Sequence, residues 1–376
     1  MKNIIFCADG TWNGPGQDTD SAAPATPTNV YRLYVNLAGE DDQAALLHAN
    51  EQERRDGPHE APSQVAKYLH GVGDSNNPLV KMLGGTFGAG IVARIIRGYT
   101  FISRNYEPGD RIFITGFSRG AYTARALGGL ICAKGLLDAS KLPLDDRETA
   151  YRLGAAVWNA WRQEQGGGKP WLARLQEAVL DLPVFFSSAP PAALLADVRI
   201  AAIGVWDTVG SLGIPAYAGG ERIDMFRFAD TKLSPKVDLG FHALALDEKR
   251  PDFEPTFWFD DPRITQCLFP GAHADVGGGY PITNHESELS DIAFLWMKEQ
   301  FASIGVAFRP QSPIPIKPDA LGCAHEPWRH FPFDVTKARA RAFTPSGNFV
   351  TSPAVAARRA GGPVKPDPDA GARPYL

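Results

Sequence analysis

The sequence predicts an α/β fold in which helices cover both faces of a doubly wound, mostly parallel sheet. Short apolar runs, such as residues 3–8 and 198–206, alternate along the chain with amphipathic segments of helical spacing. These runs are apolar at nearly every position, which is typical of strands buried on both faces. The chain has 376 residues, of which 44% are hydrophobic and 21% charged. That is enough apolar material for a full core, so the composition excludes a globally disordered protein.

The first part of the chain contributes three predicted strands, each followed by a helix. In the helix before the third strand, Ile95, Tyr99 and Ile102 fall on one face. This alternation predicts parallel strands joined by helical crossovers. The strands are at residues 3–8, 68–73 and 111–116, and the helices at residues 29–38, 91–106 and 119–133.

The rest of the chain adds an insertion, three more strands, a helix and a tail. Residues 136–195, rich in Trp and Ala, are predicted to form a helical insertion in a domain that spans residues 1–343. The tail, residues 344–376, is rich in Pro, Gly, Ala and Arg without a period, so we expect it to be loosely ordered. The strands are at residues 198–206, 242–246 and 265–269, and the helix at residues 289–301.

Charge, cysteine content and hydropathy narrow the class of protein. The net charge is −4, from 38 basic and 42 acidic residues with no block of like charges, which argues against a nucleic-acid-binding protein. The four cysteines are isolated in sequence, so we expect reduced thiols rather than a zinc or redox site. The N-terminus does not resemble a signal peptide, and no apolar run reaches the ~18 residues of a membrane span. We therefore expect cytoplasmic synthesis, from which export would require a dedicated machine.

The strongest local motif is Gly116-Phe117-Ser118-Arg119-Gly120, which has the form G-x-S-x-G. An apolar strand runs into it and a helix leaves it, as a nucleophile elbow requires. Gly116 and Gly120 let the chain turn sharply, so that the Ser118 hydroxyl projects from the C-terminal edge of the sheet. The motif predicts Ser118 as a catalytic nucleophile.

A serine nucleophile needs a base and an acid that orients the base. Of the eight histidines, His273 is the candidate base, because it follows a strand and comes after Ser118 in the order Ser, Asp, His. Two acids compete for the third role, since Asp207 and Asp247 each follow an apolar strand. The usual strand position favours Asp247, whereas the small residues around Asp207 favour Asp207. We prefer Asp207 and keep Asp247 as the alternative, which could instead pair with neighbouring cations.

The loop after the first strand begins with Asp9 and Gly10 and is predicted to supply an oxyanion hole. Thr11 or Trp12 would donate one backbone N–H, and Arg119, directly after the nucleophile, would donate the second. Asp9 is expected to brace this loop through an Asx-turn.

A metal site is the alternative interpretation of the same acids. Asp9 and Asp275, with Asp207 and His273, would then be the ligands of a metal-assisted phosphodiester or phosphate hydrolase.

Five motifs together carry a resemblance to a known family. They are Ala8-Asp9-Gly10-Thr11-Trp12-Asn13, Gly71-Val72-Gly73, Gly116-Phe117-Ser118-Arg119-Gly120-Ala121, Val205-Trp206-Asp207-Thr208-Val209-Gly210 and His273-Ala274-Asp275-Val276-Gly277-Gly278-Gly279, in that order. Over residues 3–300 the chain resembles the α/β-hydrolase family that contains the catalytic domains of the first class of type VI secretion lipase effectors. The resemblance implies an α/β-hydrolase-like catalytic domain that hydrolyses esters, with phospholipids as the characterised substrates. It also implies Ser118 as nucleophile, His273 as base and Asp207 as acid.

The sequence therefore predicts a serine esterase that acts on lipids through an acyl-enzyme. The insertion at residues 136–195 could supply a lid or an acyl pocket. No cofactor is expected, the substrate is a lipid or small ester, and membrane contact is transient. Delivery by a type VI secretion system would bring an immunity or secretion partner. A non-catalytic scaffold protein on the same fold is a third alternative, besides the metal-assisted hydrolase.

Overall fold

The computed structural model describes residues 1–10, 26–42, 51–71, 87–164, 193–209, 231–331, 333–335, 337–343 and 348–375. Nine strands form one sheet in the order β11-β10-β9-β8-β5-β1-β4-β3-β2. The seven strands from β11 to β4 in that order are parallel, and β3 and β2 complete the other edge in antiparallel orientation. The strands are β1 (Asn3–Ala8), β2 (Glu40–Asp41), β3 (Glu51–Asp56), β4 (Gln64–Leu69), β5 (Arg111–Phe117), β8 (Ile200–Trp206), β9 (Val237–Ala245), β10 (Ile264–Phe269) and β11 (Phe349–Thr351).

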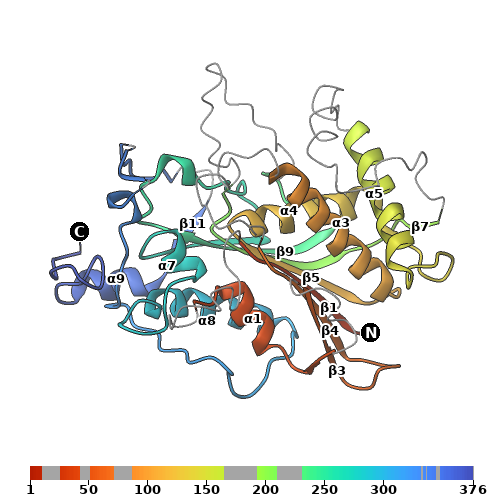
Figure 1. Cartoon of the computed structure of the whole chain (residues 1–376), viewed down its shortest axis with the longest axis horizontal. Coiled ribbons are helices and arrows are strands. Elements are labelled where there is room, and N and C mark those ends of the chain that lie inside the picture. The colour runs from red at the N-terminus through yellow and green to blue at the C-terminus, as the bar shows by residue number, and fades with distance from the viewer. Residues whose placement is uncertain are drawn as a thin grey trace.

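Two helices, α3 (Phe87–Asn105) and α4 (Arg119–Lys134), cover one face of this sheet, and α5 (Arg147–Glu164) packs against them (Figure 1). Side chains of β1 that point to this face, such as Ile4 and Phe6, pack into one core with Ile95 and Leu127 of the helices. Gly98 allows the closest approach, because a Cβ there would lie 2.7 Å from the Phe6 ring. The small residue thus brings α3 directly onto β1.

The opposite face is covered mainly by α1 (Asn29–Asn36) and α8 (Glu288–Ser303) (Figure 1). The alternate residues of β1, Ile5 and Cys7, pack here with Leu33 of α1 and Phe294 of α8. Because every β1 side chain from Ile4 onward is buried on one face or the other, the strand is apolar without alternation. The predicted α/β fold with a mostly parallel sheet is therefore confirmed.

The order of the strands reverses direction between β1 and β5. After β1 the chain crosses to the far edge of the sheet and returns inward through β2, β3 and β4, so that β4 lies beside β1. It then places β5 and β8 on the other side of β1. In doubly wound sheets the crevice at the carboxyl ends of the strands beside such a switch is the usual place for a ligand. Ser118 directly follows β5 at this point.

The second predicted strand begins and ends earlier in the chain than expected, and β3, which pairs with it in a hairpin, was not predicted. The strand at 68–73 is instead β4, and Lys67 near its centre obscures the apolar run. The Lys67 ammonium is neutralised by Glu51 at 2.8 Å and Glu53 at 3.1 Å, both on the charged strand β3. Ion pairs between strands therefore replace the hydrophobic pattern at this edge of the sheet.

The insertion is only partly described. It starts and ends in a small antiparallel pair, β6 (Leu136–Leu137) with β7 (Leu194–Leu195), and contains α5. The α5 side chains Trp158 and Trp161 are buried in the core shared with α3, so this part of the insertion is ordinary helical packing. Residues 165–192, on which the predicted lid also depends, lie outside the described residues.

The tail is more ordered than predicted. Strand β11 pairs with β10 at the edge of the sheet, and α9 (Pro353–Ala360) follows it. Arg358 of α9 is buried and donates to the carbonyls of Ala320 and Gly322, both at 2.7 Å. The expectation of loose order was wrong because three strand residues and one anchored arginine suffice to fix a polar segment.

Two further sequence expectations can be compared with the structure. The four cysteines are all unpaired thiols, and Cys7 and Cys267 are buried in strands as predicted. No helix in the described part of the chain has the length and hydropathy needed to cross a lipid bilayer.

Candidate active site

Ser118 lies at a sharp turn between β5 and α4 with backbone angles of φ 58° and ψ −121°. A positive φ is costly for a residue with a Cβ, so the turn stores strain at this serine. Two glycines, Gly116 and Gly120, allow the backbone segments around this turn to approach closely. A Cβ at Gly116 would lie 2.3 Å from the carbonyl oxygen of Gly120, and one at Gly120 would lie 2.0 Å from that of Ala8. This is the strand–turn–helix geometry that the nucleophile-elbow prediction requires.

Asp207 lies at the end of the neighbouring strand β8, in register with Ser118. The preceding residues, Phe117 and Trp206, are paired across β5 and β8, and the Ser118 N–H donates to the Trp206 carbonyl at 3.1 Å. Asp207 itself has a φ of 39° and is fully buried. The two candidate residues therefore emerge side by side at the carboxyl edge of the sheet.

His273 begins α7 (His273–Gly277), the short helix after β10, and its ring contacts Asp207. The distance from His273 Nδ1 to Asp207 Oδ2 is 2.5 Å. The His273 backbone N–H donates to Glu248 at 3.1 Å, and the ring packs against Phe117, with 4.5 Å between ring centroids. Gly277 makes room for that packing, because a Cβ there would lie 1.9 Å from the Phe117 ring.

Arg341 holds the other side of Asp207 in a two-pronged ion pair. Its Nη1 lies 2.7 Å from Oδ1 and its Nη2 2.8 Å from Oδ2, and the arginine side chain is almost fully buried. The Ala245 N–H also donates to Oδ1 at 3.0 Å. Burial opposes ionisation of Asp207, but the Arg341 charge and the bond from His273 outweigh it and hold the pKa of this carboxyl well below its usual range. Asp207 is thus a fixed carboxylate.

The surroundings of His273 favour its neutral form. Burial lowers the pKa of the ring below its usual value, although the bond and charge of Asp207 act in the opposite direction. Nearby Arg250 also lowers it. With Nδ1 held by the carboxylate, Nε2 of a neutral ring is the nitrogen that can accept a proton.

Asp9 braces the loop that follows β1 beside Ser118. Its Oδ1 accepts from the Gly10 N–H at 2.6 Å, while its Oδ2 accepts from Tyr68 at 2.5 Å and from Thr28 at 2.7 Å. A Cβ at Gly10 would lie 3.4 Å from Cβ of Ser118, so the loop starts next to the serine. Burial raises the pKa of Asp9 to about 6 despite these bonds. The loop-bracing role suggested by the sequence fits this arrangement.

The oxyanion donors are only partly described. Arg119 is the first residue of α4, directly after Ser118, and its side chain is largely buried. Burial, together with the charge of Arg94, lowers the pKa of the Arg119 guanidinium to about 9. Thr11 and Trp12 lie outside the described residues.

Asp247, the alternative acid, lies away from His273. Its carboxylate accepts from the Gly271 N–H at 2.6 Å and from the Tyr375 hydroxyl at 2.8 Å. It therefore ties the loop before α7 to the C-terminal segment. The neighbouring Arg250 pairs with Glu248 at 2.8 Å rather than with Asp247.

Asp275 is directed to a different histidine. Its Oδ1 lies 2.7 Å from Nδ1 of His325, and its Oδ2 accepts from the backbone N–H groups of Ala272 at 2.8 Å and His325 at 2.9 Å. The four residues of the metal alternative, Asp9, Asp207, His273 and Asp275, thus each have a different set of partners. Among the described residues, no group of three or more His, Cys, Asp and Glu side chains is arranged to hold a metal ion.

Sequence reasoning missed Arg341, Glu248 and Arg94. Arg94 of α3 donates to the Asp9 carbonyl at 2.6 Å and to the Leu69 carbonyl at 3.2 Å, at the ends of two neighbouring strands. Arg341 lies 134 residues from Asp207 in a polar segment without a motif. Glu248 could have been suggested by its position, since it lies shortly after the strand that ends at Ala245, where functional side chains often occur in parallel sheets. Their roles depend on contacts between distant segments, which one sequence does not encode locally.

Comparison with known proteins shows which family the chain matches. The family profile for the catalytic domain of the Tle1-like phospholipase effectors of the type VI secretion system (T6SS) matches residues 2–300. A curated relative, the uncharacterized protein YEL023C of Saccharomyces cerevisiae, is 28% identical over 268 residues, which are 71% of this chain and 34% of that protein. The chain therefore spans about a third of the length of this relative.

Two solved structures are also similar. One is the crystal structure of an uncharacterized protein from Pseudomonas aeruginosa, with 19% identity and a TM-score of 0.46 over 82% of this chain and 46% of that one. The other is the structure of the Tle1 effector bound to the VgrG spike of the type VI secretion system. It has 16% identity and a TM-score of 0.37 over 74% of this chain and 51% of that one.

Proposed function

The chain belongs to the family of Tle1-like phospholipase effector catalytic domains, and we propose that it is a serine hydrolase that cleaves carboxylic esters of phospholipids. The observation that carries this proposal is the contact of 2.5 Å between His273 Nδ1 and Asp207, fixed by Arg341 beside the strained Ser118. A carboxylate held ionised next to a neutral histidine supplies the acid and base that a serine nucleophile requires.

In the proposed reaction His273 Nε2 takes the Ser118 proton while Oγ forms a bond to the acyl carbon of the ester. The negative charge that develops on the carbonyl oxygen is stabilised by the backbone N–H of Arg119 and by one from Thr11 or Trp12. The imidazolium, stabilised by Asp207, then donates its proton to the leaving alcohol. Water activated by His273 attacks the acyl-enzyme, which releases the fatty acid and restores the Ser118 hydroxyl.

The family also supports a proposal for delivery. We propose that the protein is carried by a type VI secretion system to a phospholipid substrate, and that a secretion or immunity protein is its partner. The structure with the VgrG spike is a precedent for such a partner in another protein.

The test is labelling with a fluorophosphonate probe followed by mass spectrometry, with hydrolysis of p-nitrophenyl esters measured in parallel. We expect an adduct on Ser118, and we expect Ser118→Ala to remove labelling and lower kcat by about 10⁴–10⁶. Ser303→Ala is the matched control, because Ser303 is exposed near the end of α8. Turnover by folded Ser118→Ala would contradict the proposal. Loss of wild-type activity with a chelator would instead favour the metal-assisted hydrolase, and absence of labelling the scaffold protein.

A further inference from the structure

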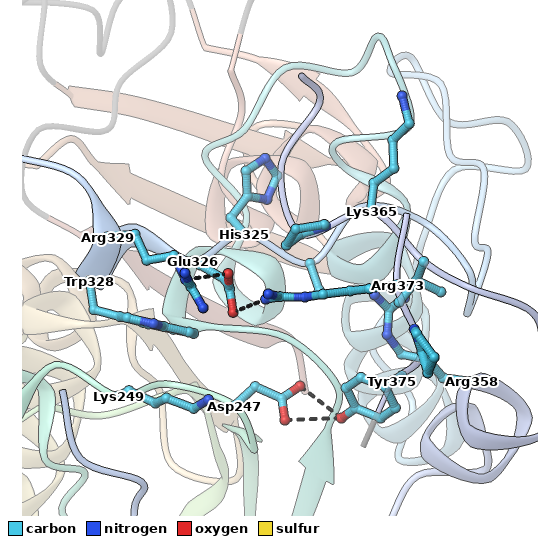
Figure 2. A pocket seen from close by; sticks show the side chains of 14 residues that line it. Asp247, Lys249, His325, Glu326, Trp328, Arg329, Arg358, Lys365, Arg373 and Tyr375 are labelled. Atoms are coloured by element: carbon cyan, nitrogen blue, oxygen red, sulfur yellow. Dashed lines mark hydrogen bonds and ion pairs between the residues drawn. The ribbon is translucent and has the colours of Figure 1, made fainter. Parts of the chain in front are cut away.

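A pocket in the described part of the chain is lined by residues of the loop after β9 and of the C-terminal part of the chain. It has a volume of about 310 Å³, within the range of small-ligand sites. The loop after β9, the segment around His325 and the last turns of the chain form its walls (Figure 2). Ser118, Asp207 and His273 do not line it. The lining side chains are Asp247, Lys249, Ala324, His325, Glu326, Trp328, Arg329, Arg358, Val364, Lys365, Pro366, Arg373, Pro374 and Tyr375.

The lining is strongly positive. Five of these side chains, those of Lys and Arg, are cations and two, Asp247 and Glu326, are carboxylates, which leaves an excess of three positive charges. A pocket with walls of one sign concentrates its field and attracts ions of the opposite sign. The chain as a whole has a net charge of −4, so the positive charge of the pocket is a local feature and not a property of the entire surface.

Arg358 places one of these charges beneath the pocket. The residue is 1% exposed, and its Nη1 donates to two backbone carbonyls while no carboxylate of the described residues pairs with it. In the described part of the chain its Nε and Nη2 have no hydrogen-bond partner. The guanidinium lies over the Tyr375 ring, 5.0 Å from the centroid. Burial lowers the pKa of this guanidinium, although the nearby Tyr375, Asp247 and Asp275 act in the opposite direction, so an anion in the pocket would further stabilise its charged form.

The carboxylates of the pocket are already occupied. Glu326 is shared by two guanidinium groups, Arg329 at 2.7 Å and Arg373, and Asp247 accepts from the Tyr375 hydroxyl (Figure 2). Lys249 is held over the Trp328 ring, with Nζ 5.1 Å from the centroid. The cations therefore exceed the anions that the protein itself supplies.

We propose that this pocket binds the phosphate group of a small organic phosphate or a phospholipid headgroup. Phosphate is a multivalent anion with oxygens that accept from several cationic donors at once, as Lys249, Arg358 and Arg373 would provide. The pocket is larger than one phosphate, so it leaves room for the attached organic group.

The pocket is also connected to the element that carries His273. Asp247 bonds to the Gly271 N–H just before α7, and His325 bonds to Asp275 within α7. Binding a ligand at these walls is expected to stabilise α7 and the loop before it, since a ligand that prefers the folded state raises its stability. The proposal does not depend on the chemistry of Ser118, so it can fail or succeed independently of the proposed hydrolase.

The test is isothermal titration calorimetry of the full chain with inorganic phosphate and with glycerol 3-phosphate, alongside co-sedimentation with vesicles of phosphatidylglycerol. Binding of either soluble phosphate with a Kd below about 1 mM identifies a free phosphate as ligand. Vesicle binding that is lost in the pocket variants identifies a lipid headgroup. Both outcomes support the proposal, and the absence of both overturns it.

Three variants locate the binding. Lys249→Gln and Arg373→Gln each remove one cation from the rim and should weaken binding about tenfold, and Arg358→Gln tests the buried charge. The matched control is Arg359→Gln, since Arg359 is the exposed neighbour of Arg358 on α9 and lies outside the pocket lining. Should Arg359→Gln weaken binding as much as Lys249→Gln, or should neither rim variant weaken it, the pocket is not the site.

Discussion

Two buried aspartate–histidine pairs lie close together in this protein, and they differ in almost everything but the contact itself. In the first, Asp207 holds Nδ1 of His273 at 2.5 Å, and in the second, Asp275 holds Nδ1 of His325 at 2.7 Å. Both aspartates are fully buried and both histidines nearly so. Asp275 is only two residues from His273, on the same short helix α7.

The neighbours of each pair set opposite protonation preferences. Asp207 is also bound by Arg341, and burial leaves the pKa of His273 below its usual value. For His325, burial acts in the same direction, but the bond to Asp275 and the nearby Glu286 carboxylate outweigh it and raise its pKa. The His325 ring is also stacked on Tyr280, with centroids 3.4 Å apart, and its Nε2 lies 3.4 Å from Glu286.

Because the same contact occurs in both pairs, the contact alone does not assign a catalytic role to either. The first pair combines a neutral ring, a carboxylate fixed by a cation and a strained serine at the same sheet edge. In the second pair both ring nitrogens of His325 are used, Nδ1 by Asp275 of α7 and Nε2 by Glu286 just before α8, so that the histidine joins these two elements. We therefore expect the first pair to act in the reaction and the second to act in stability.

The largest effect is expected on kcat, which should distinguish Asp207 from Asp275 and Asp247. Asp207→Asn keeps the size of the side chain but presents the wrong hydrogen-bond partner to His273, so kcat should fall by about 10⁴ with KM nearly unchanged. Asp275→Asn and Asp247→Asn should each lower kcat less than about tenfold, because neither carboxylate contacts His273. Steady-state kinetics on a soluble ester decides the matter. If Asp247→Asn instead lost most of its kcat and Asp207→Asn kept most of its kcat, Asp247 would be the acid.

Removing the cation of the first pair should mainly reduce stability. Arg341→Gln leaves the buried Asp207 carboxylate without its main counter-charge, so the free energy of unfolding should fall by about 3 kcal/mol. Urea denaturation measures this change. Arg339→Gln is the control, since that side chain is 73% exposed, and it should stay within about 0.5 kcal/mol of the parent. Equal effects of the two variants would show that the contact with Asp207 contributes little.

The pH dependence of kcat/KM should report the first pair. His273 must be neutral to accept the Ser118 proton, and its pKa lies below the ordinary value of about 6.5. Activity should therefore persist down to a pH below about 6.5 and then fall about tenfold per pH unit as the ring is protonated. A profile whose acid limb lies above about pH 7 would contradict a lowered pKa for this histidine.

The smallest effect should appear at the second pair. A histidine whose pKa is raised in the folded state stabilises the protein fully below the unfolded value of about 6.5, and this contribution is lost as the pH rises through the folded pKa. His325→Gln should thus lose about 1 kcal/mol more stability at about pH 5 than at about pH 9. Denaturation at the two pH values tests this, with His59→Gln as the exposed control. A loss that is the same at both pH values would show that His325 is not charged in the folded protein.

Much of the fold was predictable because local patterns encode it. The runs that form β1, β5 and β8 are mostly apolar, since helices bury both of their faces, and the helices between them have regular apolar spacing. The strands at the two edges of the sheet were not predicted from the sequence. There β3 is held by ion pairs and β11 has only three residues, so neither strand has a hydrophobic signature.

The parallel α/β architecture, the glycine turn around Ser118 and the positions of the candidate acids and base after their strands could all be predicted from the amino-acid sequence. These features depend on residues that are close in the chain, where spacing and side-chain type act directly on the backbone. Three features could not be predicted in this way: that Asp207 rather than Asp247 contacts His273, that Arg341 binds Asp207, and that a positive pocket forms around Arg358. Each of these contacts joins segments far apart in sequence, and the charge state of a buried group depends on all the neighbours that folding brings around it.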